Sequence, residues 1–506
     1  MNGINKCTFI GFALLWFTQS VLSQVNTSKA LVFSAVAGTL SKEKTIILSE
    51  KPAALKWIKG DSSFFKVSMS NKQVRIAFQP SRGFAGIVVA RVQMRNAAGK
   101  PILNMDLTGL GAKGLEGENE PPLSDIVDAL GYSIRTGWTS LSNHSLPQLQ
   151  GDEVSSAVFR KAGKGNVEMI PVARYSPDFK LLFGYYTQEN EKANTHQVGI
   201  LSEAGQFPEH QSLYPSVSSG GNSFDPGNSN FGFYATSATH TAYSEDVWNM
   251  LLYPDNAVHA TRIYQLKDKA GKVINNNYLV CFEEAKNGDY NDYVFVVKNI
   301  TPATKDPFVK LFNGTDLAGW NTFLSNIGTN KDPNSNFRVE DGVLHVVGKD
   351  VGYAITQKGF RNYHFKVDFK WGEKKWPPRL NDKRDAGICY NIPLNEIDSV
   401  WPKSIECQVQ EGDVGDFWLI GFPTIKVKGV QSKAAAYTRI TKYADAEKPY
   451  GEWNTVEVIS YNGKCVHIVN GVVVNVGEDA SLKEGRILLQ SEWAEVYYRN
   501  AALRKL

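Results

Sequence analysis

The sequence predicts an all-β protein built from several domains. Turn-forming residues recur about every ten positions between short runs rich in Val, Ile, Phe and Tyr, a spacing typical of antiparallel sandwiches and barrels. Long stretches of helical periodicity are almost absent. The chain of 506 residues is longer than one hydrophobic core normally organises, so its length favours about three domains.

The composition excludes some classes of protein and partner. Hydrophobic residues make up 42% of the chain and charged residues 21%, as in folded globular proteins. The net charge is +4, from 55 basic and 51 acidic residues that form no long run of one sign. Proteins that bind nucleic acid usually carry a concentrated basic surface, so we expect no nucleic-acid partner.

The first 23 residues have the layout of a cleavable secretory signal. Lys6 precedes the apolar run 9–17, and small residues lie near Ser23. The run is too short to span a bilayer, and no other stretch predicts a membrane span. We therefore expect the signal to be removed and the mature protein to be soluble and either secreted or periplasmic.

Four cysteines follow the signal: Cys281, Cys389, Cys407 and Cys465. They are too few for a disulfide framework in so large a chain, and their spacing does not match a zinc site. The last three lie in apolar, strand-like runs. We expect them to be small buried side chains rather than catalytic thiols.

The region 25–117 is interpreted as a small β-sandwich module. Its strand-like runs include TIILS, FKVSM, QVRIAFQP and GIVVARVQM, separated by Pro and Gly. It contains no group of polar residues that predicts chemistry, so we interpret it as a spacer or packing module. The following stretch, GLEGENEPPLSD, predicts a linker, with a short helix over 122–130.

A second β-sandwich-like module is expected over 131–299, and it ends in an acidic motif. The stretch FEEAKNGDYNDYVF places Asp289, Asn291 and Asp292, together with Glu283 and Glu284, around a glycine turn. Carboxylate and amide oxygens suit a hard cation, so the motif predicts a calcium site. Its spacing differs from an EF-hand loop, although it resembles the acidic ending of secreted bacterial β-sandwich modules. The alternative is a capped turn in which Asp and Asn bond local amides.

A polar strand stands out in the region 308–506. In SIECQVQ, residues 404–410, the side chains of Glu406, Gln408 and Gln410 share one face of a strand, and the intervening apolar residues point the other way. The pattern predicts a strand with one face in the core and one polar face. An ordinary half-buried strand with a solvated outer face would have the same pattern.

Several motifs in this region carry a family resemblance. LFNGTDLAGW, NFRVEDGVLHVVG, DAGICYN, IECQVQEGDVGDFW, GEWNTVEVI, VNGVVVN and the closing GRILLQSE and VYYRN resemble, in that order, the 3-keto-disaccharide hydrolase family. The resemblance covers about 308–506. It implies a secreted hydrolase domain with a concanavalin A-like jelly-roll fold, placed after the two β-sandwich-like modules, and a carbohydrate substrate.

On such a fold, the strand of Glu406, Gln408 and Gln410 would cross the carbohydrate-binding face, and these three are the catalytic candidates. Retaining glycosidases need two carboxylates about 5 Å apart, which one carboxylate and two amides do not supply, so a conventional endo-glucanase is disfavoured. A 3-keto sugar needs one base, stabilisation of an enolate oxygen and an acid for the leaving group. We therefore expect cleavage of a 3-keto-glycoside by hydrolysis or elimination.

Other polar and aromatic side chains are expected to bind the substrate. The candidates are Asp385 on the neighbouring strand, Trp418, and Gln490, Glu492 and Arg499 near the closing strand. Sugars require both hydrogen-bonding groups and flat apolar surfaces. For Arg499, the alternative is a structural ion pair with Glu495.

A divalent metal that polarises the ketone is a second expectation for this domain. Its ligands would be Glu406 with His345, or with the acidic turn that holds Glu411, Asp413 and Asp416.

A different class of function stays open on the sequence alone. The same polar strand would suit a carbohydrate-binding or surface-adhesion protein that does no chemistry, and jelly-rolls host both functions. A nearly isosteric Glu406→Gln substitution separates the two, because only an enzyme would lose turnover while still binding sugar.

Overall fold

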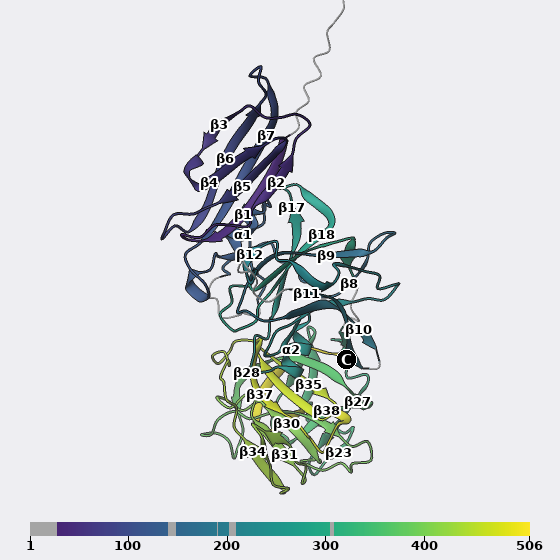
Figure 1. The fold of residues 1–506 in the computed structure, drawn as a ribbon. Helices are drawn as coiled ribbons and strands as arrows, with labels where there is room; N and C mark the ends of the chain where they lie inside the picture. Colours follow the sequence, from purple (N-terminus) through teal and green to yellow (C-terminus); the bar gives the residue numbers. More distant parts are fainter. Residues whose placement is uncertain (1–27, 140–147, 190, 202–208, 304–307) are drawn as a thin grey trace, which may run out of the picture.

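The computed structural model describes residues 28–139, 148–189, 191–201, 209–303 and 308–506. Figure 1 shows three β-rich bodies in a row, coloured from purple at the N-terminal body to yellow in the C-terminal one. The predicted all-β, multidomain fold class is confirmed. None of the helices formed by the described residues has the length and apolar character needed to cross a membrane.

The first body packs two small sheets, in the strand orders β1-β7-β6-β3 and β2-β5-β4. Buried Phe33, Phe78, Val92 and Met105 belong to the core of this body. The strands are β1 (Ser28–Val36), β2 (Lys44–Ile47), β3 (Ala54–Gly60), β4 (Phe65–Ser70), β5 (Gln73–Phe78), β6 (Gly86–Arg95) and β7 (Pro101–Ala112).

Short helical segments lead from the first body into the second. They are the 3-10 turn η2 (Gly117–Asn119) and the helix α1 (Leu123–Ala129), and α1 lies within the range expected for a helix. Another 3-10 turn, η1 (Ser62–Phe64), lies inside the first body between β3 and β4. Leu123, Ile126 and Val127 of α1 are buried in a cluster with Leu110 of β7 and Tyr264 of the second body. The linker helix therefore shares a core with both bodies.

The second body packs a sheet of order β13-β11-β10-β15-β16 against one of order β12-β9-β19-β18-β17, with β14 beside β9 and β8 paired with β20. Phe183, Phe233 and Phe295 are fully buried in its core. Its elements are β8 (Phe159–Lys161), β9 (Val167–Tyr175), β10 (Leu181–Glu189), β11 (Lys192–Leu201), β12 (Gln211–Leu213), β13 (Val217–Gly220), β14 (Ser223–Phe224), β15 (Gly232–Thr236), β16 (Thr241–Tyr243), α2 (Asp246–Leu252), β17 (Thr261–Lys267), β18 (Val273–Phe282), β19 (Tyr293–Lys298) and β20 (Ile300–Pro302).

The C-terminal body is a sandwich of two large antiparallel sheets. One has the order β24-β25-β39-β28-β35-β36-β37, with β21 beside β39. The other has the order β23-β22-β26-β38-β29-β30-β31-β34, with β27 beside β38, and β32 and β33 form a separate hairpin. We call them the eight-stranded and the nine-stranded sheet.

The strands of this sandwich are β21 (Val309–Lys310), β22 (Trp320–Leu324), β23 (Gly328–Thr329), β24 (Phe337–Glu340), β25 (Val343–Val346), β26 (Gly352–Thr356), β27 (Phe360–Arg361), β28 (Tyr363–Lys375), β29 (Gly387–Ile392), β30 (Ser404–Gln408), β31 (Phe417–Ile420), β32 (Lys426–Val427), β33 (Val430–Gln431), β34 (Tyr437–Ile440), β35 (Asn454–Tyr461), β36 (Lys464–Val469), β37 (Val472–Gly477), β38 (Glu484–Ser491) and β39 (Ala494–Lys505).

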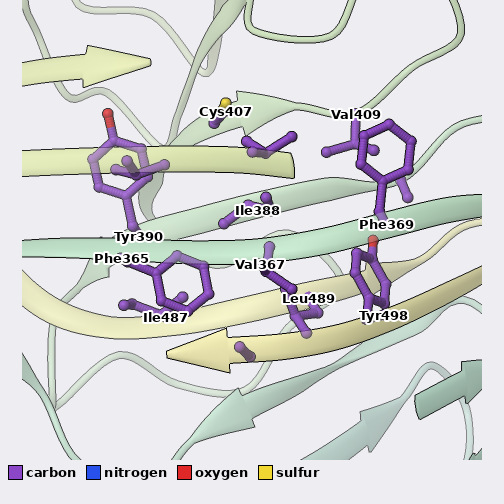
Figure 2. Packing of buried hydrophobic residues seen from close by; sticks show 14 of the residues in the cluster. Phe365, Val367, Phe369, Ile388, Tyr390, Cys407, Val409, Ile487, Leu489 and Tyr498 are labelled. Carbon is purple, nitrogen blue, oxygen red and sulfur yellow. The ribbon is translucent and has the colours of Figure 1, made fainter. Parts of the chain in front are cut away.

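Alternate side chains of the two sheets fill the space between them. Figure 2 shows Phe365, Val367 and Phe369 of β28 in the same cluster as Ile388 of β29 and Leu489 of β38. Along β30, Ile405 and Cys407 also belong to this core. A strand has a side-chain period of two, so Glu406 and Gln408 are left on the outer face of the nine-stranded sheet.

The helix α2 attaches the second body to the outer face of the eight-stranded sheet. Trp248 and Leu251 of α2 are each 1% exposed and are buried with Ile459, Tyr461 and Ile468 of the C-terminal sandwich. The Nζ atom of Lys464 donates a hydrogen bond to the Leu251 carbonyl at 2.7 Å. The opposite outer face, on the nine-stranded sheet, carries the polar residues of β30.

Candidate functional site

Neighbouring strands of the nine-stranded sheet bring residues from distant parts of the sequence together. The register places Cys389 of β29, Glu406 of β30 and Trp418 of β31 side by side, and Gly387 opposite Gln408. The strand β38 flanks β29 on its other side. A pocket opens over these strands, and we call it the Glu406 pocket; it is lined by Asp385, Trp401, Glu406, Gln408, Trp418, Ile420, Tyr437, Gln490 and Glu492.

The size of the Glu406 pocket limits what it can enclose. Its volume is about 230 Å³, below the range of about 300–1,000 Å³ usual for pockets that enclose a small-molecule ligand. A disaccharide bound here would therefore extend beyond the pocket along the outer face of the sheet.

Glu406 is a buried carboxyl group at the floor of this pocket, 5% exposed. Burial raises its pKa well above the ordinary value, and the nearby charges of Asp385 and Glu492 raise it further; a hydrogen bond from Gln490 acts in the opposite direction. Gly387 makes room for the carboxyl group, because a Cβ atom there would collide with Glu406 and Gln490. The arrangement therefore favours the protonated form of this carboxyl group.

Arg379 connects the two other carboxylates of the site. Its Nη1 atom lies 3.1 Å from Asp385 Oδ2, and its Nη2 atom lies 2.6 Å from Glu492 Oε1. Burial raises the pKa of Glu492 to about 8, and the charge of Asp385 adds to this, while Arg379 opposes it. Burial also raises the pKa of Asp385. Burial, together with the excess of three carboxyl groups over one guanidinium, therefore favours the protonated forms of these groups.

The two glutamines of the predicted polar face occupy different places. Gln408 ends β30 and lines the pocket, and its Oε1 atom accepts a hydrogen bond from the Val409 amide at 2.9 Å. Gln410 lies beyond the end of the strand, and its Nε2 atom donates to Asp385 Oδ2 at 2.6 Å. Gln410 thus contacts the site through Asp385, and it is not among the residues that line the pocket.

Aromatic side chains form the rest of the pocket. Trp401, Trp418 and Tyr437 line it beside Ile420. Trp401 and Trp418 pack against a buried apolar cluster on the same face, which includes Leu488. The indole nitrogen of Trp418 is buried without a hydrogen-bond partner among the described residues. Flat apolar faces next to hydrogen-bonding groups are suited to binding sugar rings.

Arg499 lies on the other side of the sandwich from the pocket. Its strand β39 belongs to the eight-stranded sheet, and its Nε atom lies 3.2 Å from Asp368 Oδ2, while the guanidinium lies 3.9 Å from the centre of the Trp453 ring. Glu495, the expected alternative partner, is instead 2.9 Å from His345 Nε2. The structure therefore does not bring Arg499 to the Glu406 pocket.

The structure also separates the ligands expected for a metal in this domain. His345 lies on β25, where its neighbours Leu344 and Val346 are in the core, so its side chain is on the outer face of the eight-stranded sheet. Glu406 is on the outer face of the other sheet. A metal ion held by both residues is thus a wrong expectation, because the whole sandwich lies between them.

The acidic turn after β30 is balanced by basic residues. Glu411 lies 3.0 Å from Arg384, and Asp413 lies 3.0 Å from Lys383. Asp416 lies 2.6 Å from Arg439. These ion pairs explain the three acidic residues of the turn as structural, because each carboxylate is paired with a basic side chain.

Among the described residues, one group of acidic side chains has the spacing needed to hold a metal ion. It consists of Glu283, Asp289 and Asp292 in the second body, with carboxylate oxygens within 4.8 Å of one another. The sequence motif predicted Asp289 and Asp292 as ligands. It also predicted Asn291, whose Nδ2 atom donates to the Pro121 carbonyl at 3.0 Å.

The sequence predicted most of the pocket but did not single out three lining residues, Trp401, Ile420 and Tyr437. It also did not point to Arg379, which contacts two of the carboxyl groups. Arg379 lies between β28 and β29, outside any strand, so no alternation pattern points to it. The available signal was its position in the basic stretch RLNDKRD, six residues before Asp385. Tyr437 begins β34, a strand at the edge of the sheet, and is 56% exposed.

Comparison with known proteins finds relatives of part of the chain. A curated relative from Bacteroides thetaiotaomicron named 3-keto-disaccharide hydrolase is 23% identical over 185 residues, which cover 33% of this chain and 57% of the relative. The chain thus spans little more than half the length of that relative.

Solved structures also align with about two fifths of the chain. A putative glycosyl hydrolase from Parabacteroides distasonis has 20% identity and a TM-score of 0.29, covering 40% of this chain and 95% of that one. The carbohydrate-binding module CBM66 from Bacillus subtilis has 10% identity and a TM-score of 0.28, covering 39% and 100%. The family predicted from the sequence motifs is confirmed, because residues 307–504 match the model of the 3-keto-alpha-glucoside-1,2-lyase-like domain.

Proposed function

We propose that the C-terminal domain cleaves the glycosidic bond of a 3-keto-glycoside, such as a 3-keto-disaccharide, in the Glu406 pocket. The observation that carries the proposal is the burial of Glu406 beside Asp385 and Glu492, which raises the pKa of this carboxyl group well above its ordinary value. The family description, a 1,2-lyase-like domain for 3-keto-alpha-glucosides, supports the substrate class and a reaction across C1 and C2.

The chemistry follows from the ketone at C3, which acidifies the hydrogen on C2. Glu406, in its ionised form, takes this proton, and the electron pair of the C2–H bond moves to the C3 oxygen as an enolate. Collapse of the enolate restores the ketone, forms the C1–C2 double bond and breaks the bond from C1 to the leaving oxygen. Glu406 then gives its proton to that oxygen, so one carboxyl group serves as base and as acid. Addition of water to the double bond would complete a net hydrolysis.

The neighbours of Glu406 supply the other requirements of this reaction. A base that removes a proton from carbon works best when its pKa lies near the working pH. Burial and the nearby charges of Asp385 and Glu492 raise the pKa of Glu406 from its ordinary acidic value in that direction. Amide groups of Gln408 and Gln490 and the guanidinium of Arg379 are the donors available to an enolate oxygen. Gln410 acts through Asp385 as a positioning residue.

Trp401, Trp418 and Tyr437 are proposed to hold the sugar rings. Their position along the mouth of the pocket suits a substrate that extends beyond the enclosed volume. We also propose that the protein acts outside the cytoplasm as a secreted or periplasmic enzyme; its expected signal, residues 1–23, lies outside the described residues.

A second candidate function is sugar binding without cleavage. The aromatic wall of the pocket favours it, because stacking surfaces occur in carbohydrate-binding modules and enzymes alike. It predicts that Trp401→Ala weakens binding while no substrate, oxidised or not, is turned over.

The deciding experiment is a product assay on a 3-keto-disaccharide and on its unoxidised parent, with the purified protein and its Glu406→Gln variant. We expect cleavage of the oxidised sugar alone, a loss of at least 100-fold in kcat in the variant, and sugar binding that changes little. Glu495→Gln, the same change on the opposite sheet, is the matched control and should retain activity. If neither sugar is cleaved while both are bound, the enzymatic proposal fails and the binding function stands.

A further inference from the structure

Three carboxylates are buried together where β18 leads into β19, far from the Glu406 pocket. Glu283, Asp289 and Asp292 are 0%, 4% and 6% exposed. Their hydrogen-bond partners include backbone amides of the turn, and Asp289 Oδ2 accepts a hydrogen bond from Asn287 Nδ2 at 2.9 Å, but no cationic side chain is paired with them among the described residues. Buried charges of one sign are normally paired with an opposite charge, so this group needs a specific explanation.

Turn capping explains part of the arrangement. Glu283 accepts hydrogen bonds from the amides of Ala285 at 2.9 Å and Gly288 at 3.0 Å, and Asp292 accepts one from the amide of Glu284. A capped turn of this kind is common. It accounts for Glu283 and for one oxygen of Asp292.

Three acceptor atoms of this turn remain after capping, and one of them is Asn287 Oδ1. Asp289 Oδ1 and Asn291 Oδ1 are buried and have no hydrogen-bond partner among the described residues. The residues are 4% and 2% exposed, so bulk water does not satisfy them. Buried polar atoms are usually paired with protein or with a bound species. Asp289 is one of the three residues whose carboxylate oxygens lie close together. A cation bound among these three carboxylates would give Asp289 Oδ1 a partner.

We propose that Glu283, Asp289 and Asp292 bind a calcium ion, with the side-chain amide oxygen of Asn291, its Oδ1 atom, as a further ligand. All of these donors are oxygens, which selects a hard cation, and the set contains neither thiolate nor imidazole. Calcium accepts irregular sets of six to eight oxygens, whereas magnesium demands near-octahedral geometry. A motif with two carboxylates and an amide within four consecutive residues matches calcium better.

The position of the group gives the cation a structural role. The Nδ2 atom of Asn291 donates to the Pro121 carbonyl at 3.0 Å, and Glu120 accepts a hydrogen bond from Gln211 at 2.6 Å. Because Asn291 contacts the linker directly, a cation bound by Asn291 and its neighbours would hold the linker between the first and second bodies against the second body.

The test is a calcium titration of the full mature chain after treatment with EDTA, followed by calorimetry and by thermal unfolding, with magnesium in parallel. We expect one calcium ion per chain, a higher Tm with calcium than with magnesium, and slower proteolysis of the linker around residue 120. This measurement on the unmodified protein does not depend on the folding of any variant.

The variant Asp289→Asn separates a cation site from a capped turn. Without calcium it removes repulsion, so its Tm should equal or exceed that of the unmodified protein; with calcium it should lose the rise in Tm. Asp225→Asn, an exposed aspartate in the same body that pairs with Lys161, should keep that rise. Absence of calcium binding to the unmodified protein at millimolar concentration, or an unchanged calcium effect in Asp289→Asn, would overturn the proposal.

Discussion

Arg379 lies 2.6 Å from Glu492 at the edge of the Glu406 pocket, and the same guanidinium reaches Asp385 at 3.1 Å. These contacts join the loop between β28 and β29 to the turn between β38 and β39. They also place a fixed positive charge beside two carboxyl groups whose pKa values burial raises.

Replacement of Arg379 by Met should damage both stability and turnover. Removal of the guanidinium leaves Asp385 and Glu492 without their cationic partner, and an unpaired buried polar group costs roughly 1–3 kcal/mol. We expect a lower urea midpoint and a loss of at least tenfold in kcat/KM. Arg379→Lys keeps the charge but not the fork that reaches both carboxylates, so it should recover stability more than activity. An activity equal to that of the unmodified protein in Arg379→Met would exclude Arg379 from the site.

Stability should depend on the protonation of Glu492. Because the pKa of Glu492 is raised to about 8 from an ordinary value of 4.5, the folded state binds this proton more tightly than the unfolded state. Its contribution to stability is complete below about pH 4.5 and is lost as the pH rises toward 8. The side chain in Glu492→Gln cannot ionise. The free energy of unfolding of this variant should therefore fall less between pH 5 and pH 8 than that of the unmodified protein, and the difference should be about 1 kcal/mol or more.

Urea unfolding of both proteins at the two pH values measures this difference. Glu340→Gln, which replaces an exposed carboxylate on β24, serves as the control and should follow the unmodified protein. An equal pH dependence in Glu492→Gln would show that this group does not titrate in the range.

The pocket should be sensitive to a single methyl group at Gly387. A Cβ atom at this position collides with the Glu406 carboxyl group and the Gln490 amide, so Gly387→Ala should displace the base. We expect a loss of roughly 100-fold in kcat, because catalysis depends on positions held to within about 1 Å. Gly221→Ala, where a Cβ atom meets nothing within 4 Å, is the control. Full activity in Gly387→Ala would mean that the carboxyl group has room to move without consequence.

The contact between the second and third bodies depends on Trp248. This side chain is 1% exposed between α2 and the eight-stranded sheet, and truncation of a buried Trp to Ala costs about 3–5 kcal/mol. We expect Trp248→Ala to lower the Tm of the second body and to separate its calorimetric transition from that of the C-terminal sandwich. Leu252→Ala, on the same helix but 38% exposed, should unfold like the unmodified protein.

The sequence alone determined the features that depend on local geometry. The alternation in SIECQVQ put Glu406 and Gln408 on the face opposite Ile405 and Cys407, because a strand has a period of two. Turn spacing predicted the all-β class, and the ordered motifs predicted the family of the C-terminal region. For the acidic motif, one short stretch of sequence identified Asp289 and Asp292, whose carboxylate oxygens lie close together in the structure.

Only the tertiary structure decided which of these groups meet. Gln490 and Arg499 lie nine residues apart, yet β38 and β39 belong to different sheets, so one faces the pocket and the other Asp368. Arg379 meets Glu492 across 113 residues, and no periodicity in a loop encodes such a contact. The physical reason is that local pattern fixes the direction of a side chain relative to its own strand, whereas its neighbours depend on strand order and on which sheet each strand joins.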